Sequence, residues 1–216
     1  MGKVRHLGII PDGGGRWANR EKLSLADGYR VSMGKILAIA EAFFNHGGQE
    51  MSVYLFSIDN FKRLNWEIDA LMDVAAEFIK DLEDRRPSLG FSASHVGRLD
   101  LLRPDVQQAI RSMLSADRSG AVMNILLGYD YWDELREAVR SGTLTGEQPL
   151  FNGFAVPTSV DLVIRTGGAR TLSKFLPLQT AHARLIFWDD LFNDLSVEDF
   201  LATIVEHEEL DLKFGN

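Results

Sequence analysis

A glycine-rich segment near the start of the sequence contains residue types that bind phosphate groups. Asp12 follows a short apolar run, Gly13, Gly14 and Gly15 come next, and Arg16 follows them. Glycines let backbone N–H groups approach phosphate oxygens, arginine can bind those oxygens through two hydrogen bonds, and a carboxylate can hold a bridging Mg²⁺. The spacing fits neither the Walker A nor the dinucleotide-binding pattern. A purely structural turn is therefore an equally good interpretation of this segment alone.

A second polar segment follows the next apolar run. Ser57, Asn60 and Arg63 place a hydroxyl, an amide and a guanidinium close together in the sequence, and Phe61 adds an apolar surface. Such a set could bind and orient a reacting anion. Asp59 and Asn60 together are also a common turn signal, so a simple turn is the alternative.

A third segment combines an arginine with paired glycines. Arg165 ends an apolar run, the pair Gly167–Gly168 follows, and Arg170, Ser173 and Lys174 come after it. These residue types suit a second anion-binding loop. A solvated basic turn is the alternative for this segment.

The net charge favours the anion-binding interpretation of the three segments together. The chain has 31 Asp and Glu against 23 Lys and Arg, which gives a formal net charge of −8. Nucleic-acid binding normally needs a surplus of positive charge, and an anionic membrane surface would repel this chain, so we expect neither as a partner. No apolar run approaches the ~18 residues of a membrane-spanning helix, so we expect no stable membrane insertion. Arginine-bearing loops on such an acidic chain are hard to explain as three unrelated turns.

Several other chemistries find no support in the sequence. The chain has no cysteine, which excludes disulfides, cysteine-ligated zinc and a thiol nucleophile, and which fits a cytoplasmic protein. The five histidines show no HExxH spacing, so we expect no zinc site. The GxSxG pattern of a serine hydrolase is also absent.

The elements that must position these segments alternate between strands and helices. We expect strands over residues 6–11, 51–57, 91–97, 122–127, 161–165 and 185–188. Apolar residues at helical spacing predict helices over residues 29–44, 68–82, 104–117, 132–140 and from Ser196 to about 209. This alternation predicts the α/β class, with a mostly parallel central sheet flanked by helices on both faces. The length fits a single domain over residues 1–216. Ligands bind beyond the carboxyl ends of such strands, which is where the three polar segments stand.

The three segments, in this order, resemble the motifs of the cis-prenyltransferases, the undecaprenyl diphosphate synthase family. The family pattern H-x-x-x-I-M-D-G-N-G-R-W-A corresponds to HLGIIPDGGGRWA at residues 6–18. The pattern F-S-x-E-N-W-x-R corresponds to FSIDNFKR at 56–63, with Glu67 at the family spacing, and D-L-x-I-R-T-G-G-E-x-R-x-S-N-F to DLVIRTGGARTLSKF at 161–175. The resemblance covers essentially the whole chain. It implies an enzyme that joins an allylic prenyl diphosphate to a second isoprenoid diphosphate, usually as a homodimer.

The resemblance also implies roles for individual residues. Asp12 is expected to hold Mg²⁺ and diphosphate, Ser57 and Asn60 to act at the reacting carbons, with Asn60 in proton transfer, and Arg165 and Ser173 to bind the second diphosphate. The other substrate-binding residues that it implies are Gly13, Gly14, Gly15, Arg16, Trp17, Leu25, Tyr29, Phe61, Arg63, Glu67, Arg170 and Thr171. The growing chain is expected to lie in a tunnel between the sheet and the first two helices.

The sequence departs from the family pattern where the family binds the donor diphosphate and the metal. The family has Asn at position 14, Arg and His at 25 and 29, Glu and Arg at 169 and 171, and a metal-binding Glu at 184. This chain has Gly14, Leu25, Tyr29, Ala169, Thr171 and Arg184 at those positions. We expect Arg184 to neutralise diphosphate directly and to replace part of the metal's charge. The segment from Ser24 to Tyr29 resembles the small branch that makes irregular, lavandulyl-type diphosphates.

Three functions remain open at this point. The first is a synthase that condenses dimethylallyl diphosphate, and also geranyl diphosphate, head to middle to an irregular C10 or C15 diphosphate. The second is an ordinary short-chain cis-prenyltransferase that uses isopentenyl diphosphate. The third is a catalytically silent partner subunit of the same fold, which the retention of Asp12, Asn60 and Arg165 argues against. The true acceptor, the product length and any cyclisation stay open.

Overall fold

The central sheet of the computed structural model has six parallel strands, and the structure describes residues 3–85, 88–114, 120–141 and 153–209. The strands are β1 (His6–Ile10), β2 (Glu50–Ser57), β3 (Phe91–Val96), β4 (Ala121–Tyr129), β5 (Leu162–Arg165) and β6 (Arg184–Phe187). Their spatial order is β3-β4-β2-β1-β5-β6, and every neighbouring pair is parallel. The prediction of a parallel α/β sheet is confirmed.

The position of β1 decides where a ligand can bind. β1 lies between β2 and β5. The strands that follow it in sequence, β2 to β4, extend the sheet on one side of β1, and β5 and β6 extend it on the other side. This change of direction is a topological switch point, and parallel sheets bind ligands beyond the strand ends at such points. The segments that follow β1, β2 and β5 are the three polar segments of the sequence.

The helices that link the strands follow the apolar spacing closely. They are α1 (Gly14–Arg20), α2 (Leu25–Asn45), α3 (Asn65–Arg85), α4 (Pro104–Leu114), α5 (Tyr131–Arg140) and α6 (Val197–Glu209), with short 3-10 turns η1 (Ile58–Lys62), η3 (Leu99–Leu101) and η4 (Phe192–Asp194). Ser24 caps α2 by accepting a hydrogen bond from the backbone N–H of Asp27, as expected for a serine before a helix. Residues 115–117, expected at the end of the third helix, lie outside the described residues. Among the described residues, no helix is both long and apolar enough to cross a bilayer.

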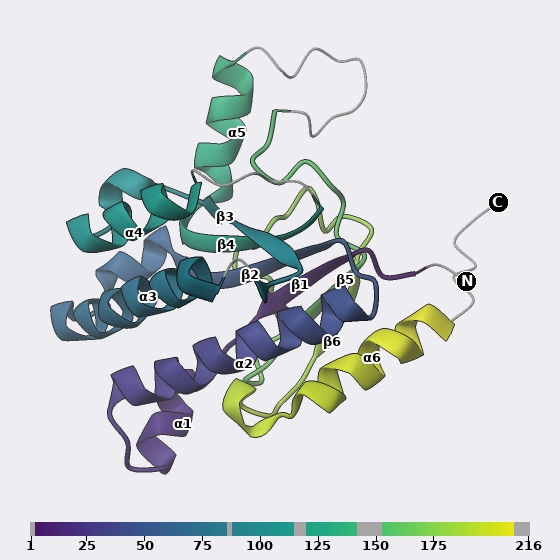
Figure 1. Ribbon diagram of the computed structural model, residues 1–216, viewed down its shortest axis with the longest axis horizontal. Coiled ribbons are helices and arrows are strands. Elements are labelled where there is room, and N and C mark those ends of the chain that lie inside the picture. Colours follow the sequence, from purple (N-terminus) through teal and green to yellow (C-terminus); the bar gives the residue numbers. More distant parts are fainter. Residues whose placement is uncertain (1–2, 86–87, 115–119, 142–152, 210–216) are drawn as a thin grey trace.

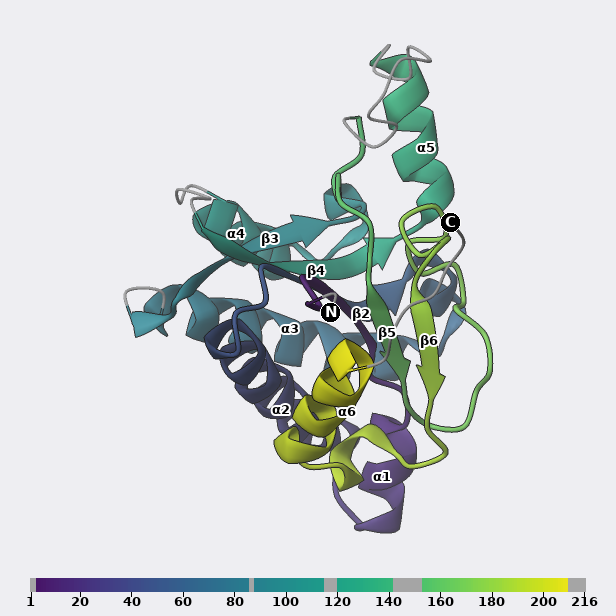
Figure 2. The same cartoon turned by 90° about the vertical axis from the view of Figure 1, so that its right-hand side faces the viewer.

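The two faces of the sheet are covered differently. Helices α2, α3, α4 and α6 cover one face, where the larger apolar core lies (Figures 1 and 2). The smaller core on the other face joins strand residues to the chain between residues 154 and 176, which contains no helix or strand apart from β5. Helix α5 projects away from the body of the protein (Figure 1). In the described part of the chain, the helices that flank the sheet thus gather mainly on the first face, and irregular chain covers much of the second.

Gly8 explains how an irregular segment can pack so closely against β1. A Cβ atom on Gly8 would lie 2.8 Å from the ring of Phe175 and 3.2 Å from Val163. The absence of a side chain on Gly8 therefore lets Phe175 reach the sheet. Phe175 directly follows the third polar segment, so this contact fixes that segment over the strand ends.

A buried polar cluster occupies the same face at the opposite, amino edge of the sheet. His6 Nε2 lies 2.8 Å from Ser52 Oγ, and His6 Nδ1 lies 2.9 Å from Thr158 Oγ1. The Glu50 carboxylate accepts hydrogen bonds from Thr158 Oγ1 and, at 2.6 Å, from Asn124 Nδ2. We call these five residues the amino-edge cluster. Each member has at least one partner inside the cluster.

Candidate active site

The carboxyl ends of β1, β2 and β5 enclose a cavity of about 300 Å³. The strand register places Ile10 of β1 opposite Arg165 of β5, and Ser57 ends β2 on the other side of β1. The three polar segments thus meet as predicted. The cavity is lined by Ile10, Pro11, Asp12, Gly13, Gly14, Tyr29, Tyr54, Leu55, Phe56, Ser57, Asn60, Arg63, Leu71, Arg165 and Ser173.

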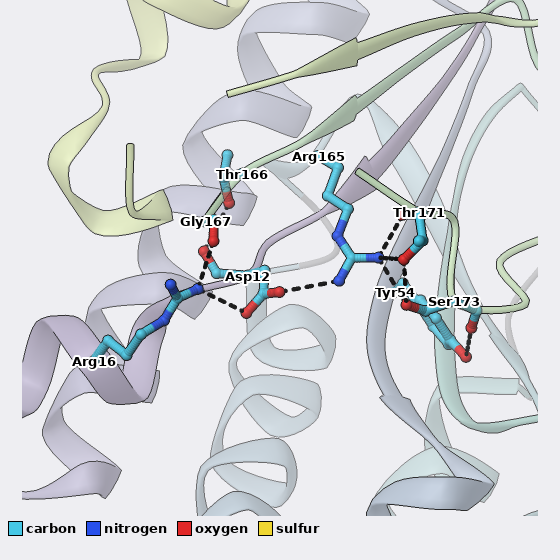
Figure 3. A network of polar contacts seen from close by, with 8 residues as sticks. All are labelled: Asp12, Arg16, Tyr54, Arg165, Thr166, Gly167, Thr171 and Ser173. Atoms are coloured by element: carbon cyan, nitrogen blue, oxygen red, sulfur yellow. Dashed lines mark hydrogen bonds and ion pairs between the residues drawn. The ribbon is translucent and has the colours of Figure 1, made fainter. Parts of the chain in front are cut away.

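The Asp12 carboxylate lies between two arginines that come from different elements (Figure 3). Arg165 Nη2 lies 3.1 Å from Asp12 Oδ2, and Arg16 Nη2 lies 3.4 Å from Asp12 Oδ1. Arg16 also donates to the carbonyl of Gly167 at 2.8 Å, and Thr166 Oγ1 donates to the carbonyl of Asp12 at 2.8 Å. The first and third segments therefore form one connected network.

Gly167 is required for this close approach of the two segments. Its φ angle is +79°, and a Cβ atom would lie 2.5 Å from Arg16 Nη2 and 3.0 Å from the Asp12 carbonyl. A side chain at this position would meet both the unfavourable backbone conformation and the backbone of Asp12. The glycine pair thus brings Arg16 and Asp12 beside the third segment.

Arg165 has the properties of a buried anion receptor. Its side chain is only 8% exposed, and its Nη1 donates to Ser173 Oγ at 2.7 Å and to Thr171. Its buried Nε has no hydrogen-bond partner among the described residues. A buried guanidinium that shares its one carboxylate partner with another arginine is stabilised further when additional negative charge reaches it. The geometry therefore suits an anion with several oxygens, such as a diphosphate.

The second segment presents a fixed hydroxyl–amide pair to the same cavity. The Ser57 backbone N–H donates to Asn60 Oδ1 at 2.8 Å, and Ser57 Oγ donates to the same oxygen at 2.9 Å. These bonds form around the short 3-10 turn η1. They hold the Asn60 amide in one orientation with its oxygen already occupied. Asn60 and Ser57 are thus preorganised at the wall of the cavity.

Tyr29 and Arg63 form the wall on the helical side. Burial raises the pKa of Tyr29, and the guanidinium of Arg63 opposes this rise. Glu67 lies near enough to Tyr29 to raise its pKa further. A Cβ atom on Gly14 would lie 3.5 Å from the Tyr29 ring and 3.0 Å from Ser32 Oγ. The absence of a side chain at position 14 therefore spares a tight contact with Ser32, and the Tyr29 ring packs directly beside the glycine.

Tyr54 is a site residue that the sequence analysis missed. It lies on β2, lines the cavity, and its hydroxyl donates to the Ser173 carbonyl at 3.0 Å. Burial raises the pKa of Tyr54 to about 12, so the hydroxyl stays a donor. The only signal in the sequence is that Tyr54 falls on the same face of its strand as the polar residues Glu50 and Ser52. The apolar residues Leu55 and Phe56 of the cavity wall were also missed, because nothing separates them from core residues in sequence. Leu71, in contrast, belongs to one of the helices expected to line the tunnel.

Nine of the predicted site residues line the cavity, namely Asp12, Gly13, Gly14, Tyr29, Ser57, Asn60, Arg63, Arg165 and Ser173. Others lie around it. Arg16 and Thr171 contact lining residues, Phe61 packs edge-on against Phe56 with ring centres 4.9 Å apart, and Glu67 stands in the first turn of α3. Gly15 and Trp17 lie on α1, and Leu25 begins α2 within contact distance of Gly15.

Arg170, Lys174 and Arg184 do not reach the cavity within one chain. Arg170 pairs with Asp189 at 2.6 Å. Lys174 lies 2.6 Å from Asp59. Arg184 begins β6 opposite Leu162, the first residue of β5, and so lies at the amino edge of the sheet. The expectation that Arg184 meets the diphosphate beside Asp12 does not hold inside a single chain, because these residues lie at opposite edges.

The residues at the strand ends fit a magnesium ion that comes with a diphosphate. In the described part of the chain, no group of three or more His, Asp or Glu side chains is placed to hold a metal alone. Mg²⁺ commonly takes one or two carboxylates, keeps several waters and binds substrate phosphates. Asp12, whose side chain is 38% exposed at the cavity, supplies one such carboxylate. The set therefore suits a metal shared with substrate and does not suit a protein-only metal site.

Comparison with known proteins agrees with this geometry. Residues 10–215 match the prenyltransferase family model, which describes undecaprenyl diphosphate synthases. An isoprenyl transferase of Treponema denticola is 30% identical over 225 residues, which cover 99% of this chain and 98% of that protein. A tritrans,polycis-undecaprenyl-diphosphate synthase (geranylgeranyl-diphosphate specific) of Pyrococcus horikoshii is 32% identical over 228 residues, covering 98% of this chain and 86% of that protein.

Two solved structures share the fold over almost the whole chain. The lavandulyl diphosphate synthase of Lavandula x intermedia, in complex with dimethylallyl diphosphate, has a TM-score of 0.82 at 23% identity, with 96% of both chains covered. A Campylobacter jejuni protein assigned as an undecaprenyl diphosphate synthase has a TM-score of 0.80 at 22% identity, with 100% of both chains covered.

Proposed function

This chain belongs to the undecaprenyl diphosphate synthase family and is a prenyltransferase enzyme, and within that family we propose that it makes an irregular product. The proposed reaction joins two short allylic diphosphates head to middle to a lavandulyl-type C10 or C15 diphosphate. Dimethylallyl diphosphate is the proposed acceptor, and dimethylallyl or geranyl diphosphate the proposed donor. The catalytically silent alternative loses its basis, because the family is one of enzymes.

The proposed chemistry breaks one bond and forms one bond before a proton leaves. The C1–O bond of the donor breaks and the leaving diphosphate keeps the electron pair. The internal double bond of the acceptor attacks C1 of the donor, which forms the new C–C bond and a tertiary carbocation. Loss of a proton from that cation restores a double bond. Stabilising the leaving diphosphate is the main electrostatic demand of this sequence.

The strand-end network supports the first step. Asp12 lies between Arg16 and Arg165, so we place the donor diphosphate beside Arg16 and the acceptor diphosphate beside Arg165 and Ser173. Both arginines would neutralise charge as the donor ionises. Asp12 would hold a Mg²⁺, which when bound would supply Lewis-acid stabilisation of diphosphate oxygens. We assign Asn60 and Ser57 to direct the departing proton toward the released diphosphate.

One observation above all supports the irregular product: Tyr29 and Gly14 line the same cavity as Asp12 and Arg63. The family places a histidine and an asparagine at these two positions. We therefore place these changes where a diphosphate would be selected and activated. A change of chain length alone would need changes only in the tail pocket. Head-to-middle coupling requires such selection, because both substrates can ionise. The solved lavandulyl diphosphate synthase shows that this fold accommodates dimethylallyl diphosphate.

The cavity supports a short product. At about 300 Å³ it lies at the small end of ligand pockets, and Phe56, Leu71 and Tyr29 are among its walls. We further propose that the whole chain is one catalytic domain and that it works in the cytoplasm as a homodimer. Trp132 and Val139 on the projecting helix α5 are 47% and 62% exposed, which supports an apolar contact between subunits there.

The second candidate is an ordinary short-chain cis-prenyltransferase. It is favoured by the names of the relatives, isoprenyl transferases, and by the presence of Ser57, Asn60 and Arg63 around one cavity. In that reaction the acceptor is isopentenyl diphosphate, which cannot ionise as an allylic diphosphate does.

Substrate dependence separates the two candidates. The purified enzyme is incubated with Mg²⁺ and dimethylallyl diphosphate alone, isopentenyl diphosphate alone, or both, and diphosphate release is measured together with extractable prenyl product. The irregular synthase forms a C10 product from dimethylallyl diphosphate alone. A strict requirement for isopentenyl diphosphate would replace this proposal with the second candidate. The variant Asp12→Asn serves as the control for non-enzymatic solvolysis.

A further inference from the structure

The backbone beside Ser173 adopts a conformation that residues with side chains avoid. The φ angles of Ser173, Lys174 and Leu176 are +48°, +70° and +39°. This left-handed region is uncommon for residues other than glycine, and neighbouring residues in it need compensating contacts. An outlier of this kind at a substrate-binding loop points to a function for the conformation it creates.

The unusual backbone turns Lys174 toward the loop that follows β2. Lys174 Nζ lies 2.6 Å from Asp59 Oδ2 and 4.0 Å from Asp130 Oδ2. Asp59 stands directly before Asn60 in the turn η1. Lys174 directly follows Ser173, whose hydroxyl contacts Arg165. One ion pair thus joins the loop that holds the proposed proton-transfer amide to the loop that holds the proposed diphosphate receptor.

Two further contacts surround the Lys174–Asp59 ion pair. The Tyr54 hydroxyl of β2 donates to the Ser173 carbonyl at 3.0 Å, so a second bond ties the loop after β5 to the strand that precedes η1. The other carboxylate oxygen of Asp59, Oδ1, accepts a hydrogen bond from Lys62 Nζ at 2.8 Å. Hydrogen bonds from Lys174 first, and from Lys62, hold the pKa of Asp59 at about 2. The carboxylate therefore stays charged throughout the range in which the enzyme could work.

We propose that the Lys174–Asp59 ion pair is a positioning device that sets the separation between the two substrate loops. The inference rests on the proposed function of Asn60, Arg165 and Ser173. Arg165 keeps its own contacts with Asp12 and Thr171, so binding of the diphosphate does not depend on Lys174. What depends on Lys174 is the place of that diphosphate relative to Asn60. Loss of the pair should consequently slow turnover and leave substrate affinity nearly unchanged.

The test is a set of charge variants with a control inside the same cluster. We expect Lys174→Met and Asp59→Asn each to lower kcat about tenfold, with KM changed by no more than about twofold, because displacement of a bound reactant by less than 1 Å has effects of this size. The double variant should be no slower than the single variants. Lys62→Met removes the other cation on Asp59, whose contact stays within its own loop, and should keep kcat within about twofold of the wild type.

Two more variants separate positioning from a structural role. Lys174→Arg keeps a cation at this position and should keep most of the wild-type kcat. Lys174→Gly relieves the backbone strain at +70° and removes the cation, so its thermal stability should equal or exceed the wild type while kcat still falls about tenfold.

Three results would overturn the inference. They are a wild-type kcat for Lys174→Met, an equal loss of kcat for Lys62→Met, and a loss for Lys174→Met confined to KM, which would make Lys174 a direct diphosphate ligand. All rates are measured with dimethylallyl diphosphate, and also with added isopentenyl diphosphate. Failure of the proposed function changes which substrate mixture the wild type uses. Failure of the inference instead appears as one of the three results above in the mixture that reacts.

Discussion

The two edges of the sheet hold polar clusters of similar size that differ in how completely they are paired. In the amino-edge cluster, His6, Glu50 and Asn124 are buried and bond to one another or to Ser52 and Thr158. At the carboxyl edge, the buried Arg165 keeps an Nε with no partner among the described residues, and Asp12 is partly exposed. A buried network with every group bonded stabilises a fold, and a network with donors left over is completed by a ligand.

The comparison teaches that polarity at a strand end does not by itself mark a site. Both clusters lie on parallel strands and both include residues of the first family motif, His6 and Asp12. The difference lies in what covers them, since the chain around Thr158 packs over the amino edge while the carboxyl edge opens into the cavity. Substitutions at the amino edge should therefore lower stability and spare turnover, whereas substitutions at the carboxyl edge should lower turnover and spare stability.

The largest effect is expected at the carboxyl edge. Asp12→Ala should lower kcat/KM by about a thousandfold or more, because it removes the proposed metal ligand and the carboxylate that orients two arginines. The melting temperature should stay within a few degrees of the wild type, since Asp12 is partly exposed. Steady-state kinetics gives kcat/KM, and differential scanning calorimetry on the same preparation gives the melting temperature. A folded Asp12→Ala enzyme with a near wild-type rate would remove Asp12 from the site.

A large effect on stability is expected at the amino edge. Glu50→Ala removes the acceptor for Asn124 and Thr158, and should lower the free energy of unfolding by about 3 kcal/mol, because buried polar groups are left without partners. The kcat of the remaining folded enzyme should be unchanged. Chemical denaturation gives the stability, and activity is normalised to the folded fraction. If Glu50→Ala lowers kcat as strongly as stability, the two edges are not independent.

Acidification should weaken the amino edge selectively. Burial lowers the pKa of His6, and the negative charges of Glu50 and Asp161 only partly oppose this. A histidine with a lowered folded-state pKa binds fewer protons folded than unfolded. It therefore contributes stability above pH ~6.5 that is lost as the pH falls, at up to about 1.4 kcal/mol per pH unit.

The variant His6→Asn isolates this contribution. It should be less stable than the wild type at pH 7.5, and its stability should fall less steeply between pH 6.5 and 5.5. Burial also lowers the pKa of His95, so part of the slope remains in the variant. Thermal unfolding followed across this range gives both slopes. The exposed His182 supplies the control, His182→Asn, which should leave the profile unchanged. Parallel profiles for His6→Asn and wild type would contradict the assignment.

The smallest effect is expected at Gly14. An added Cβ would lie 3.0 Å from Ser32 Oγ, which is itself held by Asn193 at 2.8 Å, so the chain at position 14 must shift slightly at the wall of the cavity. Gly14→Ala should lower kcat/KM for the allylic substrate about threefold to tenfold, corresponding to about 1 kcal/mol. Gly34→Ala is a matched control on α2, because no heavy atom lies within 4 Å of its added Cβ. It should leave the kinetics unchanged and raise stability by up to about 1 kcal/mol. Equal kinetics for both variants would show that catalysis does not depend on the absence of a side chain at position 14.

The sequence was sufficient for the sheet because each strand carries a short, mostly apolar or alternating pattern that ends at polar or glycine residues. The prediction of residues 6–11 corresponds to His6–Ile10, and that of 91–97 to Phe91–Val96. The chain that packs on the face of the sheet with the smaller core was not predictable in this way. Between residues 154 and 176 the buried apolar residues follow no helical or alternating period outside β5, so only long-range packing, such as Phe175 over Gly8, decides their place.

The candidate site was predictable where residues stand at strand ends and not where a pairing crosses loops. Asp12, Ser57 and Arg165 meet because parallel strands end at one edge. The partners of Arg170 and Lys174 are Asp189 and Asp59, and no local pattern connects these residues in sequence. The distance of Arg184 from Asp12 could have been foreseen, since it directly precedes a predicted strand and so belongs to the amino edge.

The bond that the enzyme forms tests the central claim most directly. The wild-type enzyme is incubated with dimethylallyl diphosphate alone, the product is dephosphorylated, and its carbon connectivity is determined by NMR. The account predicts a branched C10 alcohol in which C1 of one unit is bonded to the internal alkene carbon C2 of the other. A linear cis head-to-tail alcohol, formed only when isopentenyl diphosphate is supplied, would contradict the head-to-middle reaction and leave the fold and the family unchanged.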